Sequence, residues 1–459
     1  MEKVAIKWKL GYGIGDFAFS LYWTIFMSYL FFFYTDVVKI SAAAVGTLML
    51  VARIWDSIND PLVGIIADRT NTRWGKFRPY LLWFSLPLAI ICVLTFTVPN
   101  LSNTNKLIYA YASYLLLMTF YTLANIPYTA LLGVMSSNSL ERTGIASYKS
   151  VFSFLGGAVL NASLLHLAKA LGQGNEVKGW QLAIACYSLV VVILLLLTFI
   201  FTKEQVKPVI EKKTDIWKEI GDIVRNRQWL ILILFKFFFL VFYAMRSTVI
   251  IHYFKYYVGE HNFTLFNNSY SWGYEYIATV FTTAGSLFTI LGVICTRFIV
   301  KHLGKIRTYV VALIVASLAA LPFYFLSPHN LTHIFFFGML ASFAQGPIWN
   351  VLWPMYADTA DYAEFRTKKR STGLVFSATT FTGKLSWAFA AWLAGIILSH
   401  TWFVPDIEPS TGMLMGIKLQ LSFIPCAFSI LSLIIIYFYR LDDNTMKRIE
   451  KILSHRRNQ

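Results

Sequence analysis

Asp56, Asn59 and Asp60 stand within a long apolar segment, residues 42–68. The two acidic residues are four positions apart with Asn59 between them, so a helix presents all three on one face. A charged group in such a helix costs about 3 kcal/mol unless it is paired or faces water. Two carboxylates and an amide oxygen suit Na⁺, whereas burial and mutual repulsion favour a protonated carboxyl. The spacing therefore predicts a cation site for H⁺ or Na⁺, with no other metal and no cofactor.

A structural role for these side chains is the alternative. Arg53 lies one turn before Asp56 and could neutralise it, and Asp60 directly precedes Pro61, where it could brace a kink. Other polar groups close by would favour the cation site.

Polar residues also surround Pro127 in the apolar segment 105–133. Thr122 and Asn125 lie within about one turn of this proline, which frees a backbone carbonyl. They could complete a cation shell, hold a sugar hydroxyl, or satisfy the broken helix's own backbone.

Further groups of a sugar-binding type occur in other apolar segments. Asp16 is followed by Trp23, and this combination offers a carboxylate for hydroxyl pairs and an aromatic face for a pyranose. Thr380 and Lys384 are spaced i, i+4. Arg246 is central in its own segment, which makes it a candidate ligand.

The elements that carry these residues are membrane helices. The chain has 459 residues, of which 57% are hydrophobic and 14% charged, and this composition excludes an ordinary soluble domain. A spanning helix needs about 20 apolar residues. Twelve such segments are predicted, at 10–36, 42–68, 79–99, 105–133, 147–169, 180–202, 229–256, 271–300, 308–327, 332–358, 372–398 and 411–439.

The basic residues give the orientation. The net charge of +17 is spread over alternate short loops rather than one continuous face, which argues against nucleic acid as a partner. By the positive-inside rule both termini are cytoplasmic. We expect a multi-pass protein of a bacterial inner membrane, with the lipid bilayer as its surroundings.

The chain divides near its middle. We expect an N-terminal six-helix half at 1–202, a central cytoplasmic loop at 203–228, a C-terminal half at 229–439 and a cytoplasmic tail at 440–459. A weak repeat supports this division, because Gly75-Lys76 follows the second helix and Gly304-Lys305 the eighth. Two such halves are typical of a transporter with a central site that opens alternately to either side.

Two other classes of protein fit the sequence less well. A membrane enzyme that acts on lipid-linked sugars would need catalytic groups near the headgroups, and the predicted outer loops carry no such cluster. A sugar sensor would need a signalling domain, which the short tail 440–459 does not supply. We therefore do not expect an enzyme.

Several motifs resemble the glycoside-pentoside-hexuronide:cation symporters of the major facilitator superfamily. They are Phe33-Tyr34-Thr35-Asp36-Val37-Val38, Val45-Gly46-Thr47, Arg53-Ile54-Trp55-Asp56 through Asn59-Asp60-Pro61, and Arg73-Trp74-Gly75-Lys76. The resemblance continues more thinly to Asp358, Asp361 and Lys384. It implies an all-α integral membrane protein with twelve transmembrane helices in two six-helix pseudo-repeats, the major facilitator fold.

The resemblance also implies residue roles, by position. The coupling cation would bind to Asp56, Asn59, Asp60 and Thr122. Sugar would contact Asp16, Asn125, Thr129, Lys149, Arg246, Trp349, Thr380 and Lys384. Arg246 is included because it lies near the middle of its apolar segment, and not because of the resemblance. A cytoplasmic gate would comprise Arg142, Asp358, Asp361, Glu364 and Arg366.

The sequence departs from the melibiose-transporting members of this family. Asn125 replaces an aspartate, Thr129 a tryptophan and Gly15 a lysine, and the expected arginine is absent at Ser150, next to Lys149. Loss of the aspartate favours H⁺ over Na⁺ as the coupling ion, with Na⁺ still open.

The expected function is secondary active, cation-coupled uptake of a small-molecule sugar or glycoside by alternating access, carried out by a monomer. The cationic residues Lys149, Arg246 and Lys384, set against Asp16, favour an acidic sugar such as a hexuronide. The alternative is an uncoupled facilitator or exchanger.

Overall fold

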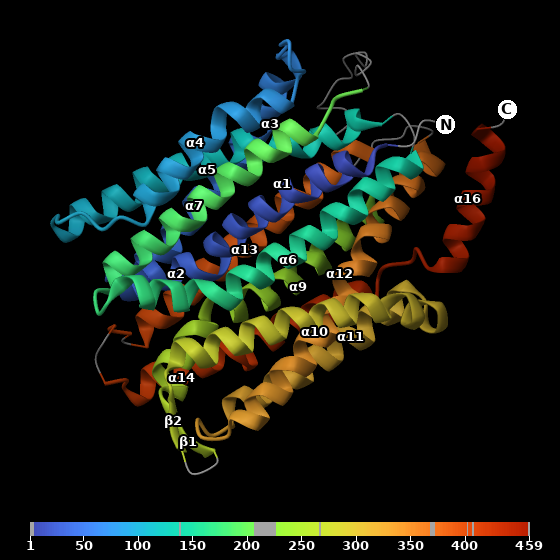
Figure 1. Cartoon of the computed structure of the whole chain (residues 1–459). Coiled ribbons are helices and arrows are strands. Elements are labelled where there is room, and N and C mark those ends of the chain that lie inside the picture. The colour runs from blue at the N-terminus through green and yellow to red at the C-terminus, as the bar shows by residue number, and fades with distance from the viewer. Residues whose placement is uncertain are drawn as a thin grey trace. The chain divides into compact units, whose positions relative to one another are not determined.

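The computed structural model describes residues 4–136, 139–205, 226–265, 268–367, 372–401, 403–405 and 408–457. The described part is helical except for one two-stranded sheet, β1-β2 (Figure 1). This confirms the predicted all-α membrane class.

The first membrane-crossing elements are built as follows. Helix one is continuous from Ile6 to Val37 and contains two π-helical segments, in the order α1 (Ile6–Thr24), η1 (Ile25–Tyr29), α2 (Leu30–Phe32) and η2 (Phe33–Val37). The next five helices are α3 (Ala42–Arg69), α4 (Arg78–Thr95), α5 (Asn103–Met135), α6 (Ser139–Gly172) and α7 (Glu176–Phe201).

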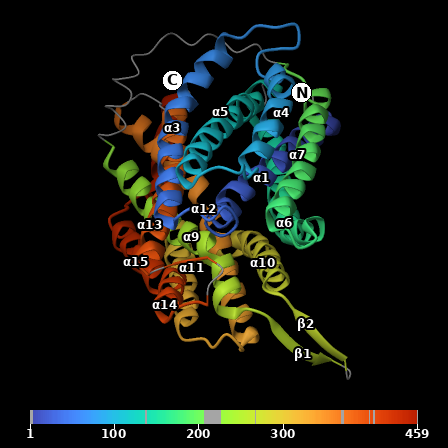
Figure 2. The same ribbon diagram turned by 90° about the vertical axis from the view of Figure 1, so that its left-hand side faces the viewer.

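The remaining elements follow residue 226. They are α9 (Arg227–His252), η3 (Tyr253–Val258), β1 (His261–Leu265), β2 (Asn268–Trp272), α10 (Tyr274–Leu303), α11 (Lys305–Ala320), η4 (Leu321–Tyr324), α12 (Leu331–Thr367), α13 (Thr372–His400), α14 (Thr411–Leu421), α15 (Phe423–Ile436) and α16 (Asp443–Arg457). The sequence did not predict the hairpin β1-β2, nor α16 in the tail. Figure 2 shows β1 and β2 side by side as this two-stranded hairpin.

Eleven helices of the described part are long and apolar enough to cross a membrane. The second predicted helix, α3, is not among them. It has 28 residues, which corresponds to about 42 Å, so its length suffices. Its interior contains Arg53, Asp56 and Asp60, which lower its hydropathy. With α3 the structure has the twelve predicted helices, and the helix that composition misses is the one that carries the candidate site.

The chain folds into two compact units. The first comprises Met1–Ile210, Asn262–Thr283 and Gly395–Glu408, and the second comprises the remainder. The predicted domain boundaries at 202 and 229 are not tested by this division and stay a prediction.

Aromatic packing fixes the helices within the first unit. The rings of Tyr12 in α1 and Tyr128 in α5 are stacked with centroids 4.6 Å apart, and the Tyr128 hydroxyl donates to the Tyr12 carbonyl at 2.6 Å. These contacts hold α1 against α5, so that the polar residues of the two helices have fixed neighbours.

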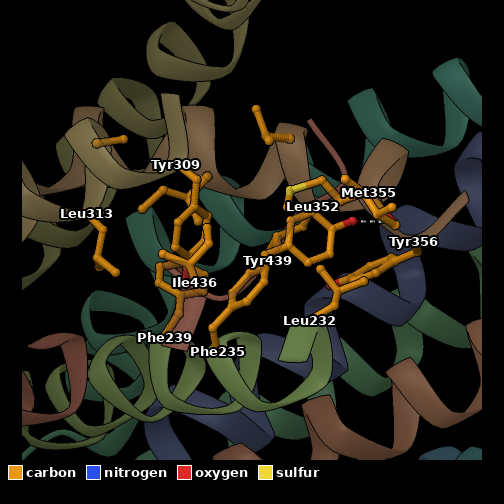
Figure 3. Packing of buried hydrophobic residues seen from close by; sticks show 14 of the residues in the cluster. Leu232, Phe235, Phe239, Tyr309, Leu313, Leu352, Met355, Tyr356, Ile436 and Tyr439 are labelled. Atoms are coloured by element: carbon orange, nitrogen blue, oxygen red, sulfur yellow. Dashed lines mark hydrogen bonds between the residues drawn. The ribbon is translucent and has the colours of Figure 1, made fainter. Parts of the chain in front are cut away.

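The core of the second unit is built around α9 and α11 (Figure 3). Phe235 and Phe239 of α9 pack edge to face against Tyr309 of α11, with centroids 5.0 and 6.1 Å apart. The Tyr309 hydroxyl is hydrogen-bonded to Ser432 at 2.7 Å, so the one polar atom of this ring is satisfied inside an apolar cluster.

Candidate functional site

Thr122 of α5 lies between the two carboxylates of α3. Its hydroxyl is 2.7 Å from Asp56 Oδ1 and 3.4 Å from Asp60 Oδ1. Asp56 is only 1% exposed. The helical spacing thus places both carboxylates on the face that meets α5, and three of the four predicted cation-site residues come together.

Arg53 neutralises one of these carboxylates. Its Nη1 is 3.2 Å from Asp56 Oδ2, and both side chains are almost fully buried. Nη2 is 3.4 Å from the Tyr114 hydroxyl, and the guanidinium lies over the Trp23 ring at 5.4 Å. The pairing considered as the structural alternative is therefore present, but it coexists with the Thr122 contacts. One arginine and two aspartates leave a formal charge of −1.

Asn59 is held by a residue that sequence reasoning missed. Its amide nitrogen donates to Thr119 Oγ1 at 3.3 Å, and the Trp55 indole N–H donates to the same oxygen at 2.9 Å. Thr119 precedes Thr122 by three residues, so the i, i+3 rule could have indicated it. Tyr114, which contacts Arg53, has no comparable spacing to the predicted site residues.

Asn125 does not join this cluster. Its side chain is half-buried and makes no hydrogen bond within the described part of the chain, while its carbonyl accepts from the Thr129 hydroxyl at 2.8 Å. The Thr129 hydroxyl is therefore engaged with its own helix. The predicted sugar contacts of these two residues stay a prediction.

Asp16 and Lys149 come together between α1 and α6. Lys149 Nζ lies 3.7 Å from Asp16 Oδ1, and one turn further along both helices Ser20 and Ser153 are hydrogen-bonded at 2.6 Å. Lys149, the neighbour of Ser150 where the family arginine is absent, therefore reaches Asp16. Its predicted sugar contact stays a prediction.

The glycine that replaces a lysine before Asp16 has a steric reason. A Cβ atom at Gly15 would lie 2.6 Å from the Tyr128 ring and 2.9 Å from Thr198. No larger side chain fits at this position without displacing α5 or α7, so the missing lysine follows from how closely the three helices pack.

The second unit holds the other predicted sugar contacts. Trp349 of α12 packs against Phe239 and Tyr243 of α9 with centroids 5.5 and 5.4 Å apart, and Tyr243 also meets Trp387 of α13 at 5.7 Å. Thr380 is exposed and Lys384 half-buried, one turn apart on α13.

Arg246 has a different environment from this group. Its guanidinium lies over the rings of Phe242 and Phe323 at 5.7 and 5.4 Å, and its buried Nε has no hydrogen-bond partner. No carboxylate of the described residues forms an ion pair with it. The guanidinium also interacts electrostatically with Tyr243, the residue that packs against Trp349. The predicted sugar contact of Arg246 stays a prediction.

The predicted gate residues lie on or near α12. Asp358 forms an ion pair with Lys305, which is also 3.4 Å from Asp443. Arg366 lies over the Tyr362 ring at 5.9 Å, and Asp361 and Glu364 are half-buried. The Arg142 side chain lies outside the described residues. Lys305 was missed because a residue at a helix start gives no sequence signal for its neighbour on α12.

Long, predominantly apolar helices, together with a cluster of carboxylates, hydroxyls and one arginine between α3 and α5, are typical of a polytopic membrane transporter. Residues 11–443 match the family described as "MFS/sugar transport protein", and the chain belongs to this family. The predicted resemblance and the major facilitator fold are thereby confirmed, and the chain is a transporter and not an enzyme.

Two relatives share the sequence over nearly its whole length, and one solved structure shares the fold. The putative glycoside/cation symporter YagG of Escherichia coli K12 is 31% identical, covering 99% of this chain and 96% of its own. The isoprimeverose transporter of Lactiplantibacillus pentosus is 32% identical, over 96% of this chain and 90% of its own. The crystal structure of a D-xylose-proton symporter, at 12% identity, superposes with a TM-score of 0.65 over 95% of this chain and 98% of that chain, which shows the shared fold.

Proposed function

We propose that this protein carries a glycoside into the cell by symport with one monovalent cation bound at Asp56, Asp60 and Thr122. The observation that carries the proposal is the Thr122 hydroxyl, which lies within hydrogen-bonding reach of both carboxylates. Buried carboxylates in a membrane helix are expensive and mark ion pathways. The names of the two relatives, a glycoside/cation symporter and an isoprimeverose transporter, agree with the proposal.

The charge of the site sets the number of ions. Arg53, Asp56 and Asp60 together carry a formal charge of −1, and a single H⁺ or Na⁺ bound among them brings this cluster to neutrality. We propose H⁺, because Asn125 is neutral where an aspartate would supply a further charged oxygen, and because burial and mutual repulsion of two carboxylates favour a protonated carboxyl.

Each unit offers candidate sugar contacts of its own: the polar residues of α1 and α6 in the first, and the aromatic residues of α9, α12 and α13 in the second. Asp16, oriented by Lys149 at 3.7 Å, is suited to a pair of sugar hydroxyls. Trp349 offers a ring face for a pyranose. Binding of ion and sugar would be coupled because each stabilises the state that can change sides.

We further propose that the protein is a monomer in a bacterial cytoplasmic membrane, with both termini on the cytoplasmic side. The basic loops support this orientation. Asp358, Asp361, Glu364, Arg366 and Arg142 would then form a gate at the cytoplasmic end.

Purified protein in liposomes tests the coupling. We expect uptake of a labelled xyloside to be driven by an imposed inward proton gradient, and more weakly or not at all by a sodium gradient. A uronide of the same size is measured in parallel, to decide between neutral and acidic substrates. Indifference to both gradients would show an uncoupled facilitator or exchanger and refute the symport proposal.

Lys149→Ala tests the sugar site. Loss of the ammonium leaves Asp16 without the charge that orients it, and we expect the KM for sugar to rise about tenfold, the size of one charge-assisted hydrogen bond. Ser150→Ala is the matched control, because its hydroxyl is exposed and bonded to the Ala146 carbonyl at 3.1 Å. An unchanged KM in Lys149→Ala, or an equal rise in the control, would remove Lys149 from the site.

A further inference from the structure

A buried lysine joins α9 to α13 in the second unit. Lys236 Nζ donates a hydrogen bond of 2.6 Å to the backbone carbonyl of Thr379, and the ammonium lies over the Tyr356 ring of α12 at 5.0 Å. Tyr356 belongs to the apolar cluster of Figure 3. Three helices therefore meet at one ammonium group.

The lysine is turned into the protein although it stands near the start of a membrane helix. Lys236 lies in the third turn of α9, from where a side chain of this length can reach the water outside the membrane. It is nevertheless only 6% exposed, and no carboxylate of the described residues forms an ion pair with it. Burial of a charged group in a membrane helix is expensive and marks functional positions.

α13 leaves the approach to its carbonyl open. In a helix the carbonyl of Thr379 also accepts the N–H of residue 383, one turn later, and this residue is a glycine. A Cβ atom at Gly383 would lie 3.8 Å from Lys236 Nζ and 3.9 Å from Leu240 of α9. The lysine therefore reaches the α13 backbone across the glycine, where the two helices approach each other closely.

The hydrogen bond adds direction to a contact that is otherwise made by rings. Phe237 of α9 packs against Phe389 of α13 with centroids 5.8 Å apart, and Tyr243 packs against Trp387 at 5.7 Å. Rings keep contact over a range of distances and tilts. A hydrogen bond to one carbonyl needs a narrow distance and angle, so the lysine fixes the register of α13 more sharply than the rings do.

Two of the predicted sugar contacts are next to this carbonyl. Thr380 follows Thr379 directly, and Lys384 lies one turn beyond Thr380. Turning α13 by one residue, about 100°, would direct both side chains elsewhere. We propose that Lys236 is a positioning residue, which fixes the rotation of α13 and so orients Thr380 and Lys384 for the sugar. This orientation rests on the proposed function, whereas the contact between the helices does not.

Lys236→Met tests the contact, because it keeps an apolar stem of similar length and removes the donor. Lys236→Gln is a second variant whose side chain is too short to reach the carbonyl, and Lys236→Arg keeps a charged donor. Lys418→Met is the matched control. Lys418 of α14 also lies over two rings, those of Tyr257 and Tyr324 at 4.9 and 5.0 Å, but its ammonium bonds no carbonyl of α13 within the described residues.

The first measurement is amide hydrogen exchange in purified protein without substrate. We expect Lys236→Met and Lys236→Gln to speed exchange at residues 379–384 about tenfold, the size of one charge-assisted hydrogen bond. Lys236→Arg should lie between these variants and wild type, and Lys418→Met should match wild type.

The second measurement is uptake in liposomes. We expect Lys236→Met to raise the KM for sugar about tenfold, with the maximal rate within twofold of wild type and partial rescue in Lys236→Arg. Combined with Thr380→Ala, the effect on KM should be smaller than the product of the two single effects, because both act on one contact with sugar. Combined with Asp16→Asn, in the other unit, the two effects should multiply.

Wild-type exchange at 379–384 in both Lys236→Met and Lys236→Gln would overturn the proposal at its structural step. An unchanged KM, an equal loss of KM and maximal rate, or independent effects of Lys236→Met and Thr380→Ala would overturn it at its functional step. The exchange measurement needs no substrate, so a protein that transports no glycoside would refute the proposed function without deciding the exchange result.

Discussion

Asp60→Asn is expected to abolish sugar accumulation against a gradient. With Arg53 paired to Asp56 at 3.2 Å, neutralising Asp60 removes the net charge of the cluster and one of its two carboxylate ligands. Symport then loses the ion that drives it, so we expect steady-state accumulation driven by an imposed proton gradient to fall to a ratio of about 1, that of an uncoupled carrier. Asp16 and Lys149 are untouched, so exchange of sugar across the membrane without a gradient should continue.

The measurement is uptake and counterflow in liposomes that contain equal amounts of each protein. Glu176→Gln is the control, because Glu176 is an exposed carboxylate in the first turn of α7. Wild-type accumulation by Asp60→Asn would contradict the assignment of the cation site. If Asp60→Asn loses counterflow as well as accumulation, Asp60 belongs to the sugar site instead.

Arg53→Leu is expected to have the largest effect on stability. Arg53 and Asp56 are 4% and 1% exposed, and removing one member of a buried ion pair costs about 3–5 kcal/mol because the other charge is left uncompensated. The expected result is a clearly lower unfolding temperature in detergent, together with loss of transport.

A second substitution separates charge from packing. Arg53→Leu/Asp56→Asn removes both charges, and we expect most of the lost stability to return, while transport stays absent because a cation ligand is gone. Arg69→Leu, at the exposed end of the same helix, is the control and should unfold like wild type. If the double variant is no more stable than Arg53→Leu, the ion pair is not what stabilises this part of α3.

The helices themselves follow from composition, because about 20 consecutive apolar residues can satisfy their backbone in lipid only as a helix. The predicted segments therefore agree closely with the structure, as 411–439 does with α14 and α15. The hairpin β1-β2 and α16 were missed, since both lie outside the apolar segments on which the prediction rested.

The candidate site was predictable in part. The i, i+4 spacing of Asp56 and Asp60 predicts their common face. Proximity to Pro127 makes both Thr122 and Asn125 candidates for the cation shell, and of these two Thr122 is the one whose side chain reaches the carboxylates. The rotation of α5 about its own axis decides which of the two residues faces α3, and that rotation is set by packing such as Tyr12 against Tyr128.

The sequence by itself determined the class of protein, the helix that carries the acidic residues and the face on which they lie, since these depend on local spacing and hydropathy. Only the tertiary structure decided which side chains from other helices meet that face. Thr119 of α5 accepts a hydrogen bond from Asn59, and Thr122 of α5 donates one to Asp56 from 66 residues away. Contacts of this kind depend on which helices are neighbours and how closely they approach, and no spacing within one helix encodes that.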